Sequence, residues 1–489
     1  MEETMVQAAA GPIESLVLLM QSLVEGVPTE HVVIEVVLLL IVIKVVFFPG
    51  KKVKRKMSAQ DESTLLDEWE PEPLVQPPAP EDDPVVVEGV VGTKVKIDGQ
   101  MALNLASFNF LGMVGRDETR EVAEKAARQY GIGSCGPRGF YGTIDCHLQL
   151  EEDLAKFFGA EEAIIYSYGF STIASVIPAY CKRSDIIFFD KGVTFAIQKG
   201  LVASRSRLIP FEHNNMEDLE RLLKIQADED KKDVQKAQST RRFMVVEGMY
   251  EYSGDIAPLD KLLELKYKYK VRLFVEESMS FGVLGAHGKG ITEHFDVEAS
   301  KIDCIAASMG NSLGTIGGFA VGSSYVIDHQ RLSGAGYCYS ASLPPLLAVA
   351  CIEALRIIGK SNGGLQDKLV KNAELLRAKA KQIKQVVVEG FEKSPIVHLR
   401  LAYDDLSREE QNQILSQVVI AARKSGIALV SPQYVTNEEF YVPNPSIRLT
   451  VTSEHEPKEV EAAMNTLATI LHNTCPRKQG NRGRGGLSF

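Results

Sequence analysis

The stretch RLFVEES, residues 272–278, decides the fold class. Its centre is continuously apolar, a pattern typical of a strand that is buried on both faces of a parallel sheet. Six more runs share this pattern: AIIYSYGF (163–170), DIIFFD (185–190), RLIPF (207–211), RFMVVEG (242–248), CIAAS (304–308) and GGFAVGS (317–323). Helical windows with leucines on one face, such as 215–225 and 258–269, lie between several of them. The alternation predicts an α/β domain with a mostly parallel, seven-stranded sheet.

The pattern changes towards the carboxyl end of the chain. Two long charged segments, 366–386 and 407–424, have helical spacing. The apolar runs VHLRLA (397–402) and SIRLTV (446–451) are interleaved with them. This arrangement predicts a second, smaller domain of the α+β class.

The composition excludes several classes of protein. The chain has 489 residues, of which 45% are hydrophobic and 24% are charged, as in an ordinary globular protein. Lys and Arg total 54 against 64 Asp and Glu, so the formal charge of −10 gives no reason to expect nucleic-acid binding. Seven cysteines without a CxxC pair favour reduced thiols in the cytosol, with neither a zinc site nor a disulfide framework.

The first sixty residues differ from the rest. The run VVIEVVLLLIVIKVVFF, residues 32–48, is apolar except for Glu35 and Lys44. As a helix it would measure about 26 Å, close to the hydrocarbon thickness of a bilayer, so we predict a transmembrane helix. Basic residues follow it at 51–56 and none precede it, which predicts that the body of the chain is cytosolic. The apolar helical face of residues 12–24 suits either the membrane surface or a partner helix.

Proline and glycine mark the remaining boundaries. The segment from Met57 to Pro84 ends in EWEPEPLVQPPAPEDDP, whose prolines exclude a helix and favour an extended tether. The basic, glycine-rich carboxyl end is expected to be disordered. The predicted organisation is an amphipathic and transmembrane segment (1–56), a linker (57–94), a large domain (95–359), a small domain (360–475) and a tail (476–489).

Three loops are rich in glycine and serine. They are GIGSCGPRGFYGT (131–143), SMGNSLGTIGGF (308–319) and SASLPP (340–345). Such loops can bind phosphate through backbone amides and hydroxyls, and they also occur where the backbone packs tightly. The residues alone leave these two interpretations open.

The order of the motifs resembles that of a known family, the α-oxoamine synthases. These are fold-type I enzymes that use pyridoxal phosphate (PLP) to join an amino acid to an acyl-CoA. The collinear motifs are SFNFLG (107–112), YGIGSCGPRGFYGT (130–143), DKGVTFAIQKG (190–200), EGMYEYSGDIAPL (247–259), VEESMSFGVLGAHGKG (275–290), the Gly317-Gly318 loop and IRLTVTSEH (447–455). The resemblance covers residues 95–470 and implies the PLP-dependent transferase fold type I.

The resemblance also implies that the residues that handle the cofactor have been replaced. The family's lysine stands six residues before the Gly-Gly step, which in this chain is Asn311. PLP catalysis needs a lysine for the resting imine, and an amide cannot form one. Glu276 matches the carboxylate that partners the pyridine nitrogen, whereas two family histidines match Thr194 and Met279. We therefore expect that no catalytic residue remains and that the chain does not turn over alone.

These replacements permit three interpretations. The first is a degenerate subunit that pairs with an active, lysine-bearing subunit, which would hold PLP covalently. The second is a self-sufficient PLP enzyme that uses unusual, lysine-free chemistry. The third is a pure membrane scaffold. We retain the first, because the loss of the lysine and both histidines leaves no evident replacement for them in this chain.

For a degenerate subunit, the family's dimers imply a site shared across the subunit boundary. Ser340 and Ser342 would reach the partner's PLP phosphate, and Asn109 and Cys135 would lie at the interface. Arg448 matches the arginine that binds the substrate carboxylate, although it can equally serve as a structural ion-pair partner. The implied partners are a catalytic subunit, a small activating subunit, an Orm-type regulator and the endoplasmic reticulum membrane.

Overall fold

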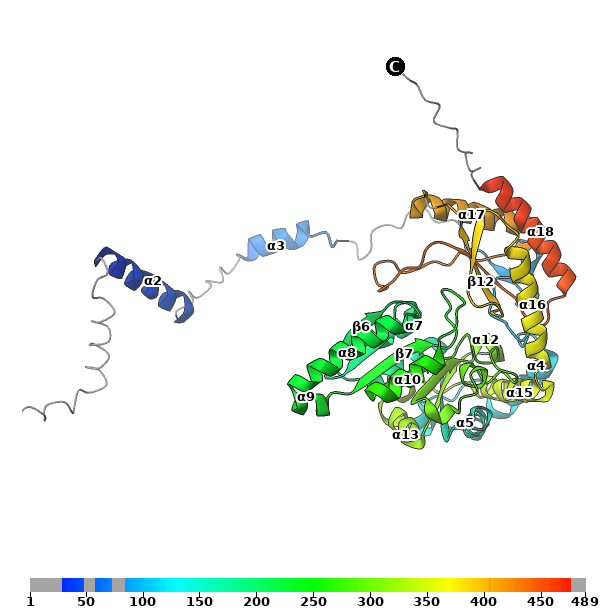
Figure 1. The fold of residues 1–489 in the computed structure, drawn as a ribbon, viewed down its shortest axis with the longest axis horizontal. Coiled ribbons are helices and arrows are strands. Elements are labelled where there is room, and N and C mark those ends of the chain that lie inside the picture. Colours follow the sequence, from blue (N-terminus) through cyan, green and yellow to red (C-terminus); the bar gives the residue numbers. More distant parts are fainter. Residues whose placement is uncertain (1–28, 48–57, 73–83, 404, 476–489) are drawn as a thin grey trace, which may run out of the picture. The chain divides into compact units, whose positions relative to one another are not determined.

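The computed structural model describes residues 29–47, 58–72, 84–403 and 405–475 (Figure 1). The chain divides into two units, Met1–Asp83 and Pro84–Phe489, and each is described by itself. The predicted helical face at 12–24, most of the prolines of the tether and the tail lie outside the described residues.

The N-terminal unit contains the described helices α2 (Thr29–Phe47) and α3 (Ala59–Glu68). Helix α2 covers most of the run that was predicted to cross a membrane, but it carries Glu30, Glu35 and Lys44 within 19 residues. Within the described ranges, no helix is both long enough and apolar enough to span a bilayer. The predicted transmembrane helix is therefore not supported by the structure.

Helix α3 corrects the prediction that the tether contains no helix. Ser58 caps its first turn, because the Ser58 hydroxyl accepts a hydrogen bond from the backbone N–H of Asp61 at 3.1 Å. The prolines begin at Pro71, after the helix has ended, so they do not interrupt it.

A seven-stranded sheet forms the large domain, with the strand order β4-β10-β9-β8-β7-β5-β6. The strands are β4 (Glu162–Tyr166), β5 (Ile186–Asp190), β6 (Arg207–Phe211), β7 (Arg242–Glu247), β8 (Arg272–Glu276), β9 (Cys304–Ser308) and β10 (Gly318–Gly322). All pairs from β6 to β9 are parallel, whereas β10 runs antiparallel to both of its neighbours. The predicted mostly parallel sheet is confirmed, and each strand overlaps a run identified from the sequence.

Helices pack against this sheet and bury its apolar strand centres, for example Phe188 and Val246. The helices are α4 (Asp117–Tyr130), α5 (Asp145–Phe158), α6 (Gly169–Tyr180), α7 (Phe195–Ser204), α8 (Met216–Lys232), α9 (Val234–Ser239), α10 (Leu259–Tyr269), α11 (Ile291–His294), α12 (Gly310–Leu313), α13 (Ser324–Ser333), α14 (Ala335–Cys338) and α15 (Pro345–Ser361). Two further helical turns are η1 (Arg138–Gly142) and η2 (Ala299–Lys301). The predicted helices at 215–225 and 258–269 are confirmed as α8 and α10.

The small domain combines long helices with short strands. Its elements are α16 (Gly364–Ala380), β11 (Val386–Glu389), β12 (Ile396–Leu401), α17 (Arg408–Lys424), β13 (Ile427–Ala428), β14 (Ile447–Thr450) and α18 (Pro457–Thr474). The predicted α+β character is confirmed. The helix expected at 366–386 ends earlier, because Val386 begins strand β11, which pairs with β12.

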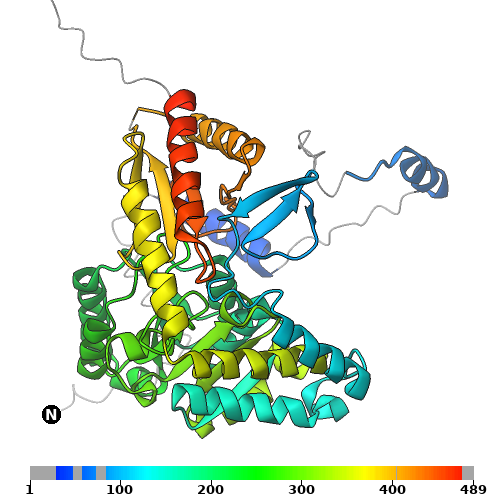
Figure 2. The ribbon, with the colours of Figure 1, turned by 90° about the vertical axis from the view of Figure 1, so that its right-hand side faces the viewer.

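A stretch from the beginning of the body joins this domain. Strands β1 (Val87–Glu88), β2 (Lys94–Ile97) and β3 (Gln100–Asn104) form a second sheet, whose β3 pairs in parallel with β13. Lys94 forms an ion pair with Glu459 of α18 at 2.6 Å, and Figure 2 places these blue strands beside the red helix. The body of the chain thus closes on itself, because its first and last segments pack together.

The glycine-rich loop 131–143 is closed by contacts within the chain. A Cβ on Gly142 would lie 2.0 Å from the carbonyl oxygen of Gly136, so only glycine fits there. The backbone N–H of Ser342 donates to the Gly136 carbonyl at 3.0 Å, and the Ser342 hydroxyl donates to the Gly142 carbonyl. Tyr141 at the tip adopts a left-handed φ of 63°. These contacts fix the loop's shape from both sides.

A buried ion pair anchors the same loop to the sheet. Both terminal nitrogens of Arg138 donate to the carboxylate of Glu151 at 2.9 Å, and their side chains are only 4% and 8% exposed. Glu151 also accepts a hydrogen bond from the backbone N–H of Ile165 in β4 at 3.1 Å. One carboxylate on α5 therefore holds both the loop and the edge strand in place.

We predict that Glu151→Ala destabilises the protein by about 3–5 kcal/mol, because it leaves the buried Arg138 guanidinium without its partner. Its exposed neighbour on the same helix offers a matched control, since Glu152→Ala is expected to change stability by no more than about 0.5 kcal/mol. Urea unfolding of both variants measures the difference. Equal losses of stability would show that the buried pair has no special role.

Candidate functional site

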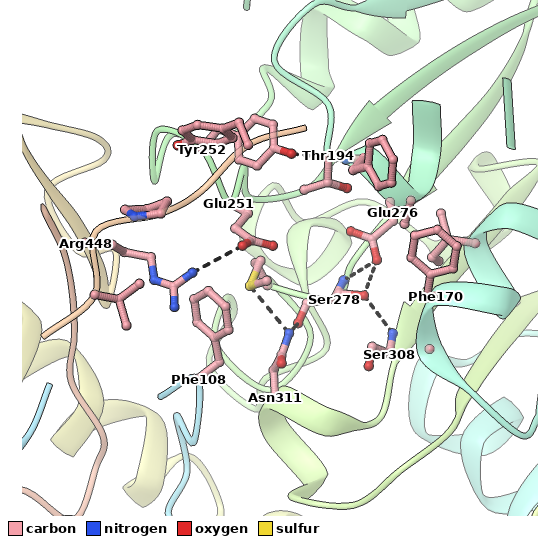
Figure 3. Close-up of a pocket in the computed structure, with 18 of the residues that line it drawn as sticks. Phe108, Phe170, Thr194, Glu251, Tyr252, Glu276, Ser278, Ser308, Asn311 and Arg448 are labelled. Atoms are coloured by element: carbon pink, nitrogen blue, oxygen red, sulfur yellow. Dashed lines mark hydrogen bonds and ion pairs between the residues drawn. The ribbon is translucent and has the colours of Figure 1, made fainter. Parts of the chain in front are cut away.

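A cavity of about 500 Å³ lies at the carboxyl ends of strands β8 and β9, where ligand sites of parallel α/β sheets are found (Figure 3). Glu276 and Ser308 end these strands and line the cavity. The small domain contributes Arg448 from β14. The other lining residues are Phe108, Gly169, Phe170, Ile173, Thr194, Phe195, Ala196, Glu251, Tyr252, Ser278, Met279, Asn311, Val430, Pro432, Gln433 and Tyr434.

Two buried carboxyls lie side by side at the floor of the site. The register of β7 and β8 pairs Glu247 with Glu276. The Glu276 carboxyl accepts hydrogen bonds from the hydroxyl and the backbone N–H of Ser278. Burial raises the pKa of Glu276 to about 8. The hydrogen bonds from Ser278 act in the opposite direction, whereas the nearby Glu277 and Glu251 carboxylates raise the pKa further. Burial and the Glu276 charge also raise the pKa of Glu247 well above its usual range. Both groups therefore bind protons more tightly than ordinary glutamates.

Asn311, on the short helix α12, lines the cavity at the position that the family motif gives to the lysine. Its side-chain amide donates to the carbonyl of Ser278 at 2.9 Å and contacts the sulfur of Met279 at 3.4 Å. Its own carbonyl accepts a hydrogen bond from the backbone N–H of Phe110 at 3.2 Å. Asn311 thus joins three loops of the site, and no lysine is among the described residues that line the cavity.

The other two replaced positions also face the cavity. Thr194 precedes helix α7, and its backbone N–H donates to the Glu247 carboxyl at 2.5 Å. Met279 is 5% exposed and contacts the Asn311 amide. The structure therefore brings Thr194, Met279, Asn311 and Glu276 together around one cavity, as the motif alignment implies.

Arg448 is held by groups on three sides. Its guanidinium lies over the ring of Phe108, 3.9 Å from the centroid, and pairs with the Glu251 carboxylate at 3.2 Å. It also donates to the carbonyl of Ala106 at 3.1 Å. Arg448 lines the cavity, so it keeps both of the roles left open by the sequence: it forms an ion pair within the chain and it faces the space where a ligand would lie.

The remaining predicted site residues lie outside the cavity lining. The Asn109 side chain is buried and accepts a hydrogen bond from the backbone N–H of Val114. Cys135 is exposed on the glycine-rich loop. Ser342 is buried and bonds within this chain to Gly142, whereas Ser340 is partly exposed and its hydroxyl contacts only the adjacent carbonyl among the described residues. Their roles towards a partner stay predictions.

The sequence interpretation missed several residues of the site. Glu247 ends a predicted strand next to the one that ends in Glu276, so the rule that parallel strands present their carboxyl ends at one edge could have identified it. Glu251 and Phe108 lie within the motifs EGMYEYSGDIAPL and SFNFLG but were not singled out there, whereas the loop segment 430–434 carries no pattern that places it at the cavity.

The sheet order, the strand-end cavity and the paired domains define the class of PLP-dependent enzymes of fold type I. Two solved structures have this fold. A serine palmitoyltransferase from Sphingomonas wittichii superposes with a TM-score of 0.72 at 23% identity, covering 85% of this chain and 96% of that one. A high-resolution structure of SPT with a PLP internal aldimine superposes with a TM-score of 0.71 at 23% identity, covering 80% of this chain and 93% of that one.

The chain belongs to the family of aminotransferases class I and II, whose model matches residues 100–467, and within it to the group named long chain base biosynthesis protein 1 or serine palmitoyltransferase 1. Long chain base biosynthesis protein 1 of Arabidopsis thaliana is 40% identical over 424 residues, 86% of each chain. Serine palmitoyltransferase 1 of Dictyostelium discoideum is 38% identical over 424 residues, 84% of this chain and 87% of its own.

The residues of this chain do not fit a covalently bound PLP. Among the described lining residues, none carries a primary amine, and Asn311 uses its amide in hydrogen bonds to neighbouring loops. Glu276 lines the cavity and could face a protonated pyridine nitrogen, and burial raises its pKa above that of an ordinary glutamate. The fold is that of a PLP enzyme, while no described residue that lines the cavity offers an amine to anchor the cofactor.

Proposed function

We propose that this chain is a non-catalytic subunit of serine palmitoyltransferase, an acyltransferase of sphingolipid biosynthesis. The enzyme condenses L-serine with palmitoyl-CoA to give 3-ketodihydrosphingosine, and it releases CoA and CO2. The relatives named above support this assignment. The observation that carries the non-catalytic role is Asn311, which stands in the cavity where the family motif has its lysine.

The proposed partner is the catalytic long-chain base subunit 2, which would bind PLP covalently at a site completed by this chain. Support comes from a cluster of exposed aromatic side chains, which we call the loop cluster: Phe140 and Tyr141 of η1 and Tyr339 beside α14 are 72%, 103% and 88% exposed. Exposed apolar groups gathered on one surface mark interaction sites. They adjoin Cys135 and Ser340, which were assigned to the interface by resemblance.

With PLP and borohydride, we expect a reduced phosphopyridoxyl group on the partner's lysine and none on this chain, because Asn311 cannot form an imine. Peptide mass spectrometry of the purified complex makes this test. Asn311→Lys is the matched variant, since it restores a primary amine at that single position and is expected to gain the label. An adduct on the wild-type chain would favour the self-sufficient, lysine-free enzyme instead.

Disrupting the loop cluster should weaken assembly. We expect Tyr141→Asp combined with Tyr339→Asp to reduce co-purification of the partner at least tenfold, because both changes place charge in an apolar interface. Tyr267→Asp, an exposed tyrosine on α10, serves as the control and should leave assembly unchanged. If the double variant assembled normally, the partner would have to bind another face.

We further propose that the chain is located at the endoplasmic reticulum membrane with its body in the cytosol, together with a small activating subunit and an Orm-type regulator. The exposed apolar side chains of α2, from Val33 to Phe47, support a membrane or membrane-protein contact. The basic residues at 51–56 support the cytosolic orientation.

Deleting residues 29–47 should release the chain from the microsomal pellet into the soluble fraction. A chain with an intact α2 and charge substitutions in α3 serves as the control and should stay with the membranes. A glycosylation acceptor placed after residue 60 should remain unmodified. Modification there, or retention of the deletion variant without its partner, would contradict the proposed attachment.

A further inference from the structure

One positively charged side chain, Arg448, lines the cavity, and its contacts show which groups of the cavity wall bind a cation. The Arg448 guanidinium lies against the face of Phe108 and pairs with the Glu251 carboxylate. An aromatic face together with a carboxylate is a common arrangement for binding organic cations in proteins. Arg448 is the only Lys, Arg or His among the described residues that line the cavity.

Elsewhere in the same cavity, two aromatic rings and a carboxyl lie together. Phe170 and Phe195 line the wall with their ring centroids 6.3 Å apart, and Figure 3 shows the Glu276 carboxyl near Phe170. Both hydrogen bonds from Ser278 go to Oε1 of Glu276. Within the described ranges, no side chain forms an ion pair with Glu276 and no group donates to its Oε2.

In the free protein, burial without a counter-ion disfavours the ionised form of the Glu276 carboxyl. Glu276 also lines the cavity, so a ligand in the cavity can reach it. Glu247, in register beside Glu276, adds a second buried carboxyl, which has hydrogen bonds with the backbone N–H groups of Thr194 and Glu251 and with the Thr194 side chain. A cation that entered the cavity would therefore stabilise the ionised form of Glu276, for which the described residues provide no counter-ion.

We propose that this cavity binds an organic ammonium ion, whose N–H groups donate to Oε2 of Glu276 and whose apolar body packs against Phe170 and Phe195. An anion would be repelled by the adjacent carboxyls, and an uncharged alcohol of the same shape would not compensate them. The inference goes beyond the proposed function, because it needs only this chain's own cavity and not a partner's chemistry.

The proposed site makes binding depend on pH in a defined direction. The charged groups that face Glu276 are Glu247 on β7, Glu251 after it, the adjacent Glu277 and, across the cavity, Arg448. Because burial raises the pKa of Glu276, the protonated carboxyl must lose its proton when it pairs with an ammonium ion. Affinity should therefore rise with pH until Glu276 is fully ionised.

Benzylamine is a suitable probe, since it stays protonated over this range and its ring matches the aromatic wall. Titration calorimetry of the full-length chain at pH 7.5 should show binding of benzylamine at least tenfold tighter than that of benzyl alcohol, an uncharged probe of nearly the same shape. Repeating the titration at pH 6 and 7, in buffers of different ionisation enthalpy, should reveal the proton released.

Variants separate the proposed contact from a general effect on folding. Glu276→Gln should weaken benzylamine binding at least tenfold and abolish the pH dependence, whereas Glu276→Asp should restore part of the affinity. Glu264→Gln is the control, because Glu264 is an exposed glutamate on α10 that does not line the cavity.

Three results would overturn the proposal: equal binding of benzyl alcohol, unchanged binding in Glu276→Gln, or affinity that does not vary with pH. Displacement of benzylamine by lower concentrations of pyridoxal phosphate would also overturn it, because the cavity would then favour the cofactor over an amine. None of these results bears on the borohydride test of the proposed function, so the two can fail separately.

Discussion

The parallel register of β7 with β8 places Glu247 opposite Glu276, and the whole cavity is organised around this pair of buried carboxyls. Both side chains are buried, and backbone N–H groups around them donate hydrogen bonds to their carboxyls. The N–H groups of Thr194 and Glu251 bond to Glu247, and that of Ser278 bonds to Glu276. The start of α7 and the loops that follow β7 and β8 are therefore positioned by two acidic side chains at adjacent strand ends.

Arg448 extends this organisation to the small domain. It stands on β14, yet it pairs with Glu251 of the large domain, stacks on Phe108 and bonds to the Ala106 carbonyl. A guanidinium suits this place because it offers donors in several directions and a flat face for an aromatic ring. Arg448 thus joins the small domain to the large domain beside the cavity, as do the hydrogen bonds of His398 with the Glu251 carbonyl and of Gln366 with the Gly282 carbonyl.

The sequence predicted the seven strands of the sheet because their centres are continuously apolar, and it predicted α8 and α10 from leucine spacing. The sequence-based predictions were wrong for helices α3 and α16, whose presence and bounds depend on capping and strand pairing. Helix α3 forms because Ser58 caps it ahead of the prolines, and α16 stops at Ala380 because the following chain pairs with β12. At the site, collinear motifs located Asn311, Thr194, Met279 and Glu276. Phe108 lies in the SFNFLG motif but was not singled out, and the segment 430–434 could not be predicted, because tertiary packing alone brings that loop to the cavity.

The self-contacting glycine-rich loop has a consequence for the speed of complex formation. Gly142 approaches the Gly136 carbonyl so closely that the loop has few alternative conformations, and Ser342 and Arg138 hold it from within the chain. The exposed rings of Phe140 and Tyr141 are thus presented in a fixed geometry before any encounter. Little conformational entropy then remains to be lost on contact, so productive collisions need not wait for a folding step in this loop.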